Sequence, residues 1–574
     1  MHARGSTTSS ISSGAMPIVK SWPIEGYLID RLHAAIGKAG LALPEGVPVE
    51  VEVPREAGHG DWASNVALTL AKSARRPPRD VAKSLIEALE VDPRVVTAVE
   101  TAGAGFLNFR LAPAWLQDTV RKILAGPDTY GASEAGGGEK VLVEYVSANP
   151  TGPLNVVSAR AASIGDTLIR ILNAAGWRAA GEFYCNDWGL QAELFGASIR
   201  TRFAESIGAT APPVPEEGYS GDYVAELVKE LDLATGRGWL ELPERDQRLK
   251  FGAWGIDRML EVQKAELERF GARIDRWMRE SELHRGGAVD AARNRLHEQR
   301  LLEQRDGALW FRSTQFGDQE DRVVVRSNGE PTYFLADAAY HNDKFSRGFD
   351  RLIDLLGPDH HGHVARMEGV IEALGWPRDR FDVIMIQWVR LLRAGEVVKM
   401  SKRSGEFITL RELIDEVGVD AARFFFLMRR AESPMDFDLE LAVRRTEENP
   451  VFYVQYAHAR IAHVLAYAKE QGVPEPDPGK AKLDLLTEPE TETLLRGLAG
   501  FPSLVAAAAR SREPHRIPAY LKDLAARFHS FYHQHRVVTA DAERTAARLL
   551  LTRATGVVLR RGLHLLGVSA PETM

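Results

Sequence analysis

The sequence predicts an α/β protein built on a parallel sheet, with an α+β domain before it and an all-α domain after it. Three observations predict this class. Between residues 139 and 405, short apolar runs alternate with amphipathic helical patterns, which is typical of βαβ units. Before residue 125 the chain mixes helical and strand-like patterns, and from residue 407 onward the pattern is helical throughout.

Composition narrows the possible classes of protein. The chain has 574 residues, enough for about four domains, and its 45% apolar and 26% charged content is typical of a soluble globular protein. The longest apolar run, Leu504 to Ala509, is far shorter than the roughly 20 residues of a membrane span. The single cysteine, Cys185, excludes an internal disulfide or multi-cysteine zinc site, indicates a cytoplasmic compartment and reads as core packing. A net charge of −7 requires any nucleic-acid contact to use local basic patches.

The N-terminal part divides into an extension and a first domain. Residues 1–16 are rich in Ser and Thr and lack the apolar core of a secretory signal, so we expect a disordered extension, with Met1 or Met16 as the start. Residues 17–125 form the first domain, and the glycine-rich stretch 131–138 marks its boundary. Its expected helices are Tyr27–Ala39 and Asp80–Leu89, and its expected strands are Val49–Val53 and Gly105–Arg110.

The middle domain, residues 139–405, begins with a buried strand at Val141–Val146. A helix follows in which Ala161, Ile164, Leu168, Ile171 and Ala175 share one face, and Gly176 is placed to end it. Further strands are expected at Glu182–Cys185, Val323–Val325, Leu352–Leu356 and Val383–Gln387. Residues 205–300 are charge-rich with a helical pattern and read as an insertion, and residues 406–445 connect the sheet to the last domain, 446–574.

Two segments have the composition of a nucleotide site. Residues 144–154 join the first strand to its helix, and ligands of open parallel sheets bind beyond the carboxyl ends of strands, where helix N-termini attract phosphates. Residues 398–405 place three cations, two hydroxyls and a glycine in a turn, which suits a loop closing over a polyphosphate. Taken singly, each is also compatible with a plain loop or a solvated basic turn.

Together, the two segments resemble a class I aminoacyl-tRNA synthetase, and the detailed resemblance is to the bacterial arginyl-tRNA synthetase family. The matching segments are VEYVSANPTG (143–152), TYFLADAAYHNDK (332–344), GPDHHGH (357–363), VKMSKRSGEFITL (398–410), GVDAARFFFLM (418–428), YVQYAHAR (453–460), GVSAPETM (567–574) and GDWASNVA (60–67). The resemblance implies a Rossmann-like catalytic domain, an N-terminal tRNA-binding domain and a helical anticodon-binding domain.

The resemblance also implies an activity. ATP and L-arginine would form arginyl-adenylate, and the arginyl group would pass to tRNA(Arg), whose binding is generally required for the first step. Mg²⁺ would accompany ATP, with no metal built into the protein. His360, His361 and His363 are not expected to bind a metal, since adjacent histidines on a turn diverge. The implied protein is a cytoplasmic monomer with no membrane contact.

Individual roles follow from the resemblance, residue by residue. The planar cationic fork of arginine requires carboxylates, and Asp337 is the best partner; Tyr333 would share its helical face. Arginine binding is expected of Glu144, Ser147, Asn149, Tyr333 and Asp337, and ATP binding of Pro153, Leu154, Val157, Gly357, Asp359, Met400 and Ser401. Catalytic contacts to the phosphates are expected of Asn155, Ser158, Lys399 and Lys402, and tRNA contacts of Asn65, Tyr453 and Met574.

One motif departs from the family. Where the family carries His-x-Gly-His, this chain has Asn155-Val156-Val157-Ser158. The amide of Asn155 and the hydroxyl of Ser158 are replacement donors, whereas Val157 adds a branched side chain where glycine lets adenine approach the backbone. Two readings follow: an active variant, which the completeness of the other motifs favours, or a catalytically silent tRNA-binding paralog. A third hypothesis is a nucleotidylyltransferase of the same superfamily that binds no tRNA.

Residues 527–536 interleave cations with aromatic side chains near the C-terminus. Such a pattern suits contacts to RNA phosphates and bases. Phe528 and Phe531 are three residues apart, and we expect these two to be helical core residues instead.

Overall fold

The computed structural model describes residues 24–54, 57–210, 212–398 and 408–574. They belong to two units. The first comprises the chain up to Arg121 together with Leu483–Ala499, and the second comprises Lys122–Lys482 and Gly500–Met574. Of the helices in these ranges, none is long and apolar enough to cross a membrane.

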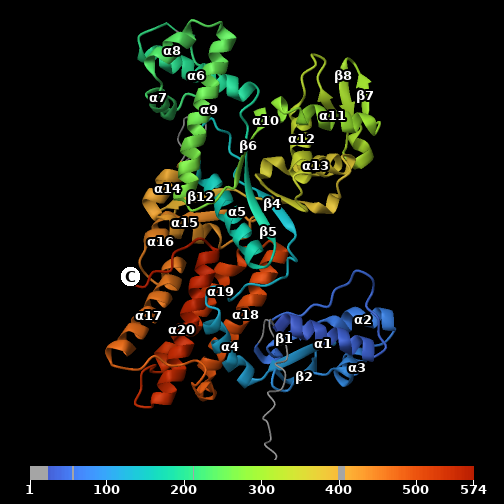
Figure 1. Ribbon diagram of the computed structural model, residues 1–574, viewed down its shortest axis with the longest axis vertical. Coiled ribbons are helices and arrows are strands. Elements are labelled where there is room, and N and C mark those ends of the chain that lie inside the picture. The colour runs from blue at the N-terminus through green and yellow to red at the C-terminus, as the bar shows by residue number, and fades with distance from the viewer. Residues whose placement is uncertain (1–23, 55–56, 211, 399–407) are drawn as a thin grey trace, which may run out of the picture. The chain divides into compact units, whose positions relative to one another are not determined.

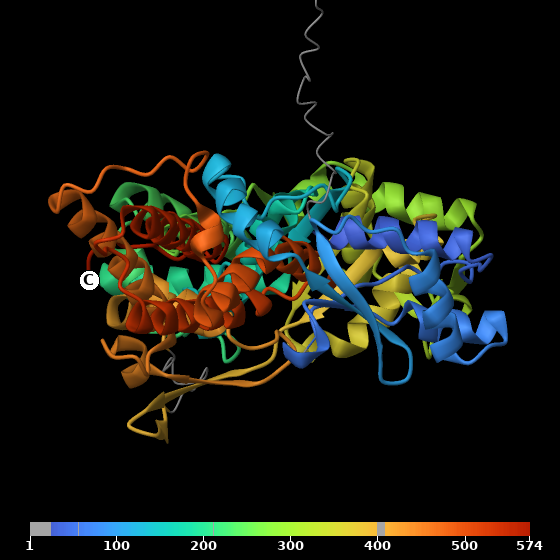
Figure 2. The same cartoon turned by 90° about the horizontal axis from the view of Figure 1, so that it is seen from below.

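The first unit is α+β. Its helices α1 (Ile24–Lys38), α2 (Val66–Ala74) and α3 (Pro78–Ala88) pack with an antiparallel sheet of order β1-β3-β2, formed by Trp62–Ser64, Phe106–Leu111 and Val96–Ala102. Figure 2 shows β2 and β3 side by side, joined by a short turn. The expected strand Val49–Val53 is wrong: its residues form only one bridge, between Glu52 and Ala63, and Val53 is exposed. The unit also holds η1 (Ala57–His59), most of α4 (Pro113–Ala125), η5 (Leu483–Leu485) and the start of α18 (Pro489–Ser511).

The second unit is built on a five-stranded parallel sheet of order β11-β10-β4-β5-β6. The strands are β4 (Lys140–Glu144), β5 (Arg178–Cys185), β6 (Arg276–Arg279), β10 (Arg351–Leu356) and β11 (Phe381–Met385). The chain runs outward from β4 through β5 and β6, then returns to the other side of β4 with β10 and β11. The direction of winding therefore switches between β4 and β10, where open α/β sheets bind ligands.

Helix α5 (Val156–Ala174) follows β4 and packs against the sheet. The apolar face expected from the sequence is confirmed, since Ala161, Ile164, Leu168 and Ile171 are buried. Gly176 has φ of 90° directly after the helix, which confirms it as the residue that ends the helix. Cys185, at the end of β5, is fully buried, as core packing requires.

The segment between β5 and β10 differs from the expected helical insertion. Helices α6 (Leu190–Ser206), α7 (Asp222–Val228), α8 (Leu233–Leu240) and α9 (Glu244–Arg269) form a helical group, drawn in green in Figure 1. Strand β6 then joins the main sheet inside the range expected to be helical. Four residues are too few for a strand to show its alternation among charged neighbours.

The expected strand at Val323–Val325 exists, but it belongs to another sheet. It is β9 (Arg322–Val325), which pairs antiparallel with β8 (Ala308–Phe311), itself paired with β7 (Leu302–Arg305). Helices α10 (Glu280–Arg285), α11 (Ala288–Glu298), α12 (Tyr333–Ser346) and α13 (His361–Ala373) share one apolar core with this small sheet. The short turns here are η2 (Ser313–Phe316), η3 (Pro358–His360) and η4 (Arg378–Arg380).

The sequence pattern predicted that the chain is helical throughout from residue 407, and strand β14 (Met435–Asp438) shows that this prediction is wrong. Strand β14 pairs parallel with β12 (Val389–Arg393), which also pairs with β13 (Glu396–Val397). Helices α14 (Leu410–Val417), α15 (Val419–Phe426) and α16 (Leu439–Val443) accompany them. The last helices are α17 (Pro450–Glu470), α18, α19 (Arg516–Gln534) and α20 (Ala542–Leu565). Phe528 and Phe531 are fully buried on α19, which confirms them as core residues.

Candidate active site

The first functional segment is a strained turn at the end of β4. The strand ends at Glu144, two residues earlier than predicted, because Val146 and Ser147 have φ of 70° and 39°. Left-handed backbone is costly for a β-branched residue and persists where surrounding contacts impose it. The turn folds Ser147 back, so that its hydroxyl donates to Glu144 Oε1 at 2.8 Å and accepts from the Tyr184 N–H at 3.1 Å. Glu144 and Ser147 thus lie together at the switch point.

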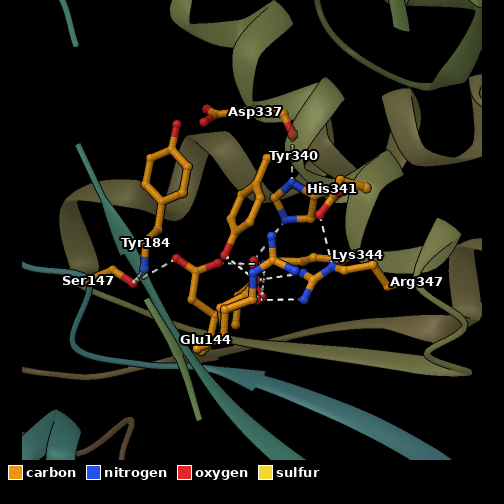
Figure 3. A network of polar contacts seen from close by, with 12 residues as sticks. Glu144, Ser147, Tyr184, Asp337, Tyr340, His341, Lys344 and Arg347 are labelled. Atoms are coloured by element: carbon orange, nitrogen blue, oxygen red, sulfur yellow. Dashed lines mark hydrogen bonds and ion pairs between the residues drawn. The ribbon is translucent and has the colours of Figure 1, made fainter. Parts of the chain in front are cut away.

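Glu144 is also the centre of a row of three buried acids. Asp354, Glu144 and Glu182 are cross-strand neighbours on β10, β4 and β5, and each is less than 10% exposed. Like charges in register repel one another. Helix α12 compensates them with two cations (Figure 3). Lys344 Nζ donates to Glu144 Oε2 and, at 2.9 Å, to Asp354 Oδ1, and Arg347 donates two bonds of 2.7 and 2.8 Å to Glu182.

Burial makes these ion pairs mutually dependent. Lys344 is completely buried, which opposes its charge, but the carboxylates of Asp354 and Glu144 raise its pKa above the usual value. Burial raises the pKa of Glu144, and Lys344 opposes that shift. Asp354 is likewise buried, yet Lys344 and His341 lower its pKa to about 2. Removing one member of such a network would leave an uncompensated buried charge.

The same network fixes the helix that carries Asp337. Asp337, His341 and Lys344 follow one another at spacings of four and three on α12, so they share a helical face. The His341 ring lies 2.8 Å from Asp354 Oδ2 through Nε2 and 2.8 Å from the Asp337 carbonyl oxygen through Nδ1. Asp337 consequently lies one helical turn before His341 on α12. In the view of Figure 3 its side chain is above those of Tyr184 and Glu144.

Asp337 has two neighbours that bear on ligand binding. Its carboxylate lies 3.2 Å from His363 Nε2 of α13, and the ring of Tyr333 lies 6.4 Å from the ring of His363. Tyr333 is the first residue of α12 and is 66% exposed. The helical arrangement of Tyr333 and Asp337 agrees with the sequence prediction.

Glu280, the first residue of α10, is a carboxylate that sequence reasoning missed. The Tyr184 hydroxyl lies close enough to lower its pKa, and the Asn186 amide, oriented with its nitrogen toward the carboxylate, donates to Oε2 at 3.0 Å. Burial and the nearby charge of Asp337 raise its pKa to about 7. Glu280 directly follows β6, so it lies at the carboxyl end of a strand. Ligands of open α/β sheets bind at the carboxyl ends of strands, so a prediction of β6 would have identified Glu280 as a candidate.

The segment that opens α5 has a defined geometry. Asn155 is the N-cap: its side-chain oxygen accepts from the N–H of Val157 at 2.9 Å and of Ser158 at 3.0 Å. The Ser158 hydroxyl also points to this oxygen, at 3.4 Å. The oxygen of Asn155 therefore serves the helix, while its NH₂ group lies at the opposite end of the amide. Val157 is half-buried in the first turn.

The remaining residues expected at a nucleotide site fall into two groups. Pro153 and Leu154 precede Asn155 after β4, while Gly357 and Asp359 follow β10, the neighbouring strand, so both segments flank the switch point. Lys399, Met400, Ser401 and Lys402 lie outside the described residues.

Comparisons with known proteins agree with this geometry. Family models match residues 27–111 (arginyl-tRNA synthetase N-terminal domain), 119–432 (class I (R) tRNA synthetase catalytic domain) and 454–574 (DALR anticodon-binding domain). An arginine–tRNA ligase of Desulforamulus reducens is 48% identical over 96% of this chain and 99% of its own length. The chain belongs to the arginyl-tRNA synthetase family.

Further relatives support the same assignment. An arginine–tRNA ligase of Moorella thermoacetica is 46% identical over 95% of this chain and 98% of its own. The fold matches that of the Thermus thermophilus arginyl-tRNA synthetase with a TM-score of 0.77, at 23% identity, covering 96% of this chain and all of that one. The chain thus has the class I catalytic domain with its parallel sheet, the family's N-terminal domain and its helical C-terminal domain.

In this arginyl-tRNA synthetase family member, the predicted tRNA contacts fall on three separate segments. Asn65 is exposed at the start of α2, and its side chain makes no cap bond to the helix. The Tyr453 ring on α17 lies 5.0 Å from that of His529 on α19, in a cluster where Arg460 stacks over Tyr456 at 4.5 Å. Burial, reinforced by Arg460, lowers the pKa of His529 to about 4, so this ring is neutral at pH 7. Met574 is 55% exposed.

Proposed function

We propose that this chain ligates L-arginine to tRNA(Arg) with ATP, through an arginyl-adenylate. The observation that carries the proposal is the pair of carboxylates, Asp337 and Glu280, beside Tyr184 at the carboxyl ends of the strands. A planar guanidinium needs acceptors arranged for paired bonds, and two neighbouring, partly buried acids suit it. Membership of the arginyl-tRNA synthetase family assigns the same reaction.

The arginine would bind with its guanidinium between Asp337 and Glu280 and with Tyr333 over its side chain. Glu144, Ser147 and Asn149 would hold the amino-acid end, near the turn after β4. The cation would neutralise two acids, one of which, Glu280, has a pKa raised first by burial and then by the nearby charge of Asp337. Binding would thus relieve an unfavourable electrostatic interaction, which favours arginine over neutral amino acids.

ATP would lie across the switch point. Pro153, Leu154 and Val157 would line the adenine, and Gly357 and Asp359 the ribose. The NH₂ of Asn155 and the cations Lys399 and Lys402, with Met400 and Ser401, would hold the phosphates, which Mg²⁺ would accompany. Ser158 would act indirectly, by orienting Asn155 through the contact between their side chains.

Two transfers complete the reaction. The arginine carboxylate attacks the α-phosphate, and the bond to pyrophosphate breaks, giving arginyl-adenylate. A ribose hydroxyl of the terminal adenosine of tRNA then attacks the arginyl carbonyl carbon, and AMP leaves. Positioned donors that stabilise the charge developing in such steps typically contribute about 10²–10³ in rate each.

We further propose domain roles. Residues 17–125 and 446–574 would bind tRNA through Asn65, Tyr453 and Met574, the catalytic domain would span 139–405, and 406–445 would connect it to the last domain. The protein would act as a cytoplasmic monomer. Tyr456 and Arg460 would add a stacking surface beside Tyr453.

Aminoacylation tests the proposal directly. Purified protein is incubated with ATP, Mg²⁺, labelled arginine and tRNA(Arg), alongside the variants Lys402→Ala and Val157→Gly. We expect the native protein to charge tRNA and Lys402→Ala to lose most of this activity. Tight tRNA binding without charging would instead support the silent paralog. Charging by Val157→Gly alone would identify the valine side chain as the cause of the block.

A further inference from the structure

The turn after β4, residues 149–154, contains two peptide bonds to proline. Asn149 precedes Pro150 and Gly152 precedes Pro153, so neither of these peptides has an N–H. The carbonyl oxygen is therefore the group through which each of these two peptides can form a hydrogen bond. In the proposed function this turn carries the first contacts to ATP, so whatever holds those carbonyls sets the position of the nucleotide.

Gln263 of α9 forms hydrogen bonds with both of these carbonyl oxygens. Its side-chain Nε2 donates to the carbonyl oxygen of Gly152 at 2.8 Å and to that of Asn149 at 3.2 Å. Gln263 is completely buried, which removes water as a competing partner. A buried amide between two carbonyls that precede proline links the turn to a helix more than 100 residues further along the chain.

Two more side chains from the same helical group bind the same turn. The hydroxyl of Tyr223, on α7, donates to the carbonyl oxygen of Thr151 at 2.8 Å. Glu266 lies three residues after Gln263, on the same face of α9, and the backbone N–H of Leu154 is near enough to lower the pKa of its carboxyl group, which burial raises. In a trans peptide the C=O and the following N–H point in opposite directions. Tyr223 therefore turns the Gly152 N–H away from the helical group.

Glu266 also connects the turn to the segment after residue 407. Its carboxylate lies 3.4 Å from Arg411, in the first turn of α14, and the N–H of Leu410 donates to the carbonyl oxygen of Leu154 at 2.8 Å. Arg269, one turn along α9, pairs with Asp415 of α14. Helix α9 thus contacts both the turn after β4 and helix α14, which Figure 1 shows beside one end of α9.

Close packing against α6 fixes the position of helix α9. It packs along α6 so closely that a Cβ atom on Gly196 would lie 1.9 Å from the carbonyl oxygen of Arg248. Backbone contact of this kind leaves little room for sliding. The side chains that reach the turn are therefore carried by a fixed element.

We propose that α9 positions the turn 149–154 for ATP, with Gln263, Tyr223 and Glu266 as positioning residues. This inference rests on the proposed function, because the turn is taken as the ATP contact. The helical segment between β5 and β6 is then part of the machinery that sets the affinity for ATP. None of the three residues needs to touch substrate.

A matched pair of glutamines provides the test. Gln247 lies on the same helix, and its Nε2 donates to two carbonyls, of Leu240 and Leu242, both at 2.8 Å, within the helical group. Gln263→Met and Gln247→Met each remove an amide that bonds two carbonyls. Because Gln263→Met removes both bonds from this side chain to the turn, we expect it to raise the KM for ATP about tenfold or more. Gln247→Met should leave it within about twofold, and both should retain the KM for tRNA.

The outcomes separate the inference from the proposed function. Equal KM values for ATP in the two glutamine variants would overturn the inference while native charging upheld the function. If the native protein does not charge tRNA, calorimetric titration of ATP into the same proteins decides the inference independently. Thermal melting reports folding, and Tyr223→Phe, which removes one hydroxyl, replaces Gln263→Met if that variant does not fold. An unchanged affinity for ATP in Tyr223→Phe would then reject the proposal.

Discussion

The ammonium group of Lys344 lies 2.9 Å from the carboxylate of Asp354, and both side chains are buried beneath the helix that carries Asp337. The contact joins α12 to β10 at the row of acids that crosses the sheet. It explains how the helix proposed to bind arginine can be held on a surface of like charges. The pocket is therefore expected to depend on residues that do not reach the ligand.

Replacing Lys344 by methionine should destabilise the protein strongly. The change leaves Glu144 and Asp354 buried without their cation, which typically costs about 3–5 kcal/mol. Urea denaturation at pH 7 measures the loss. The control is Lys229→Met, because Lys229 pairs with Glu226 on the surface, with both side chains about two-thirds exposed, where such pairs contribute about 0–1 kcal/mol. Similar losses in the two variants would contradict the structural role of Lys344.

Asp337→Asn should weaken arginine binding selectively. The amide keeps the shape but removes the charge that pairs with the guanidinium, a loss of about 1.5–3 kcal/mol, or roughly 10- to 150-fold in the KM for arginine. Asp343→Asn is a close control, since Asp343 lies on the same helix with the same side-chain exposure of 29% and pairs with Arg347. An unaltered KM for arginine in Asp337→Asn would reject its assignment.

Glu280 predicts how arginine binding depends on pH. Burial and then the charge of Asp337 raise its pKa to about 7, and only the ionised carboxylate attracts the guanidinium. The ionised fraction grows from about one tenth at pH 6 to about nine tenths at pH 8, so the KM for arginine should fall about five- to tenfold over this range. Glu280→Gln should abolish this change. A pH profile that Glu280→Gln leaves intact would assign the titration to another group.

Asn155 has two separable roles, and two variants distinguish them. Asn155→Ser keeps an oxygen that can cap α5 and removes the NH₂ donor; Asn155→Ala removes both. We expect charging to fall about 100- to 1,000-fold in each. Only Asn155→Ala should also lose about 1 kcal/mol of stability, because the cap is gone. Full activity in Asn155→Ser would show that the NH₂ group does not contact ATP.

Motifs and periodicity determined much of this protein from the sequence. The strands β4, β5, β10 and β11, the buried face of α5 and the position of Gly176 follow from local patterns, because a buried strand or an amphipathic helix carries its period in its own residues. The turn after β4 and the segment 332–344 were recognised for a different reason: their residues are contiguous and characteristic of the family.

Tertiary structure alone decided how distant residues combine. Strand β6 is four residues long among charged neighbours, so its place at the sheet edge, and with it the role of Glu280, could not be inferred from its period. The sheet assignment of β9 and the pairing of β14 with β12 depend on partners far along the chain. Lys344 and Gln263 illustrate the physical reason. Burying a polar side chain costs free energy unless hydrogen-bond partners surround it. Here those partners come from strands and turns that lie 10 to 200 residues away in the sequence.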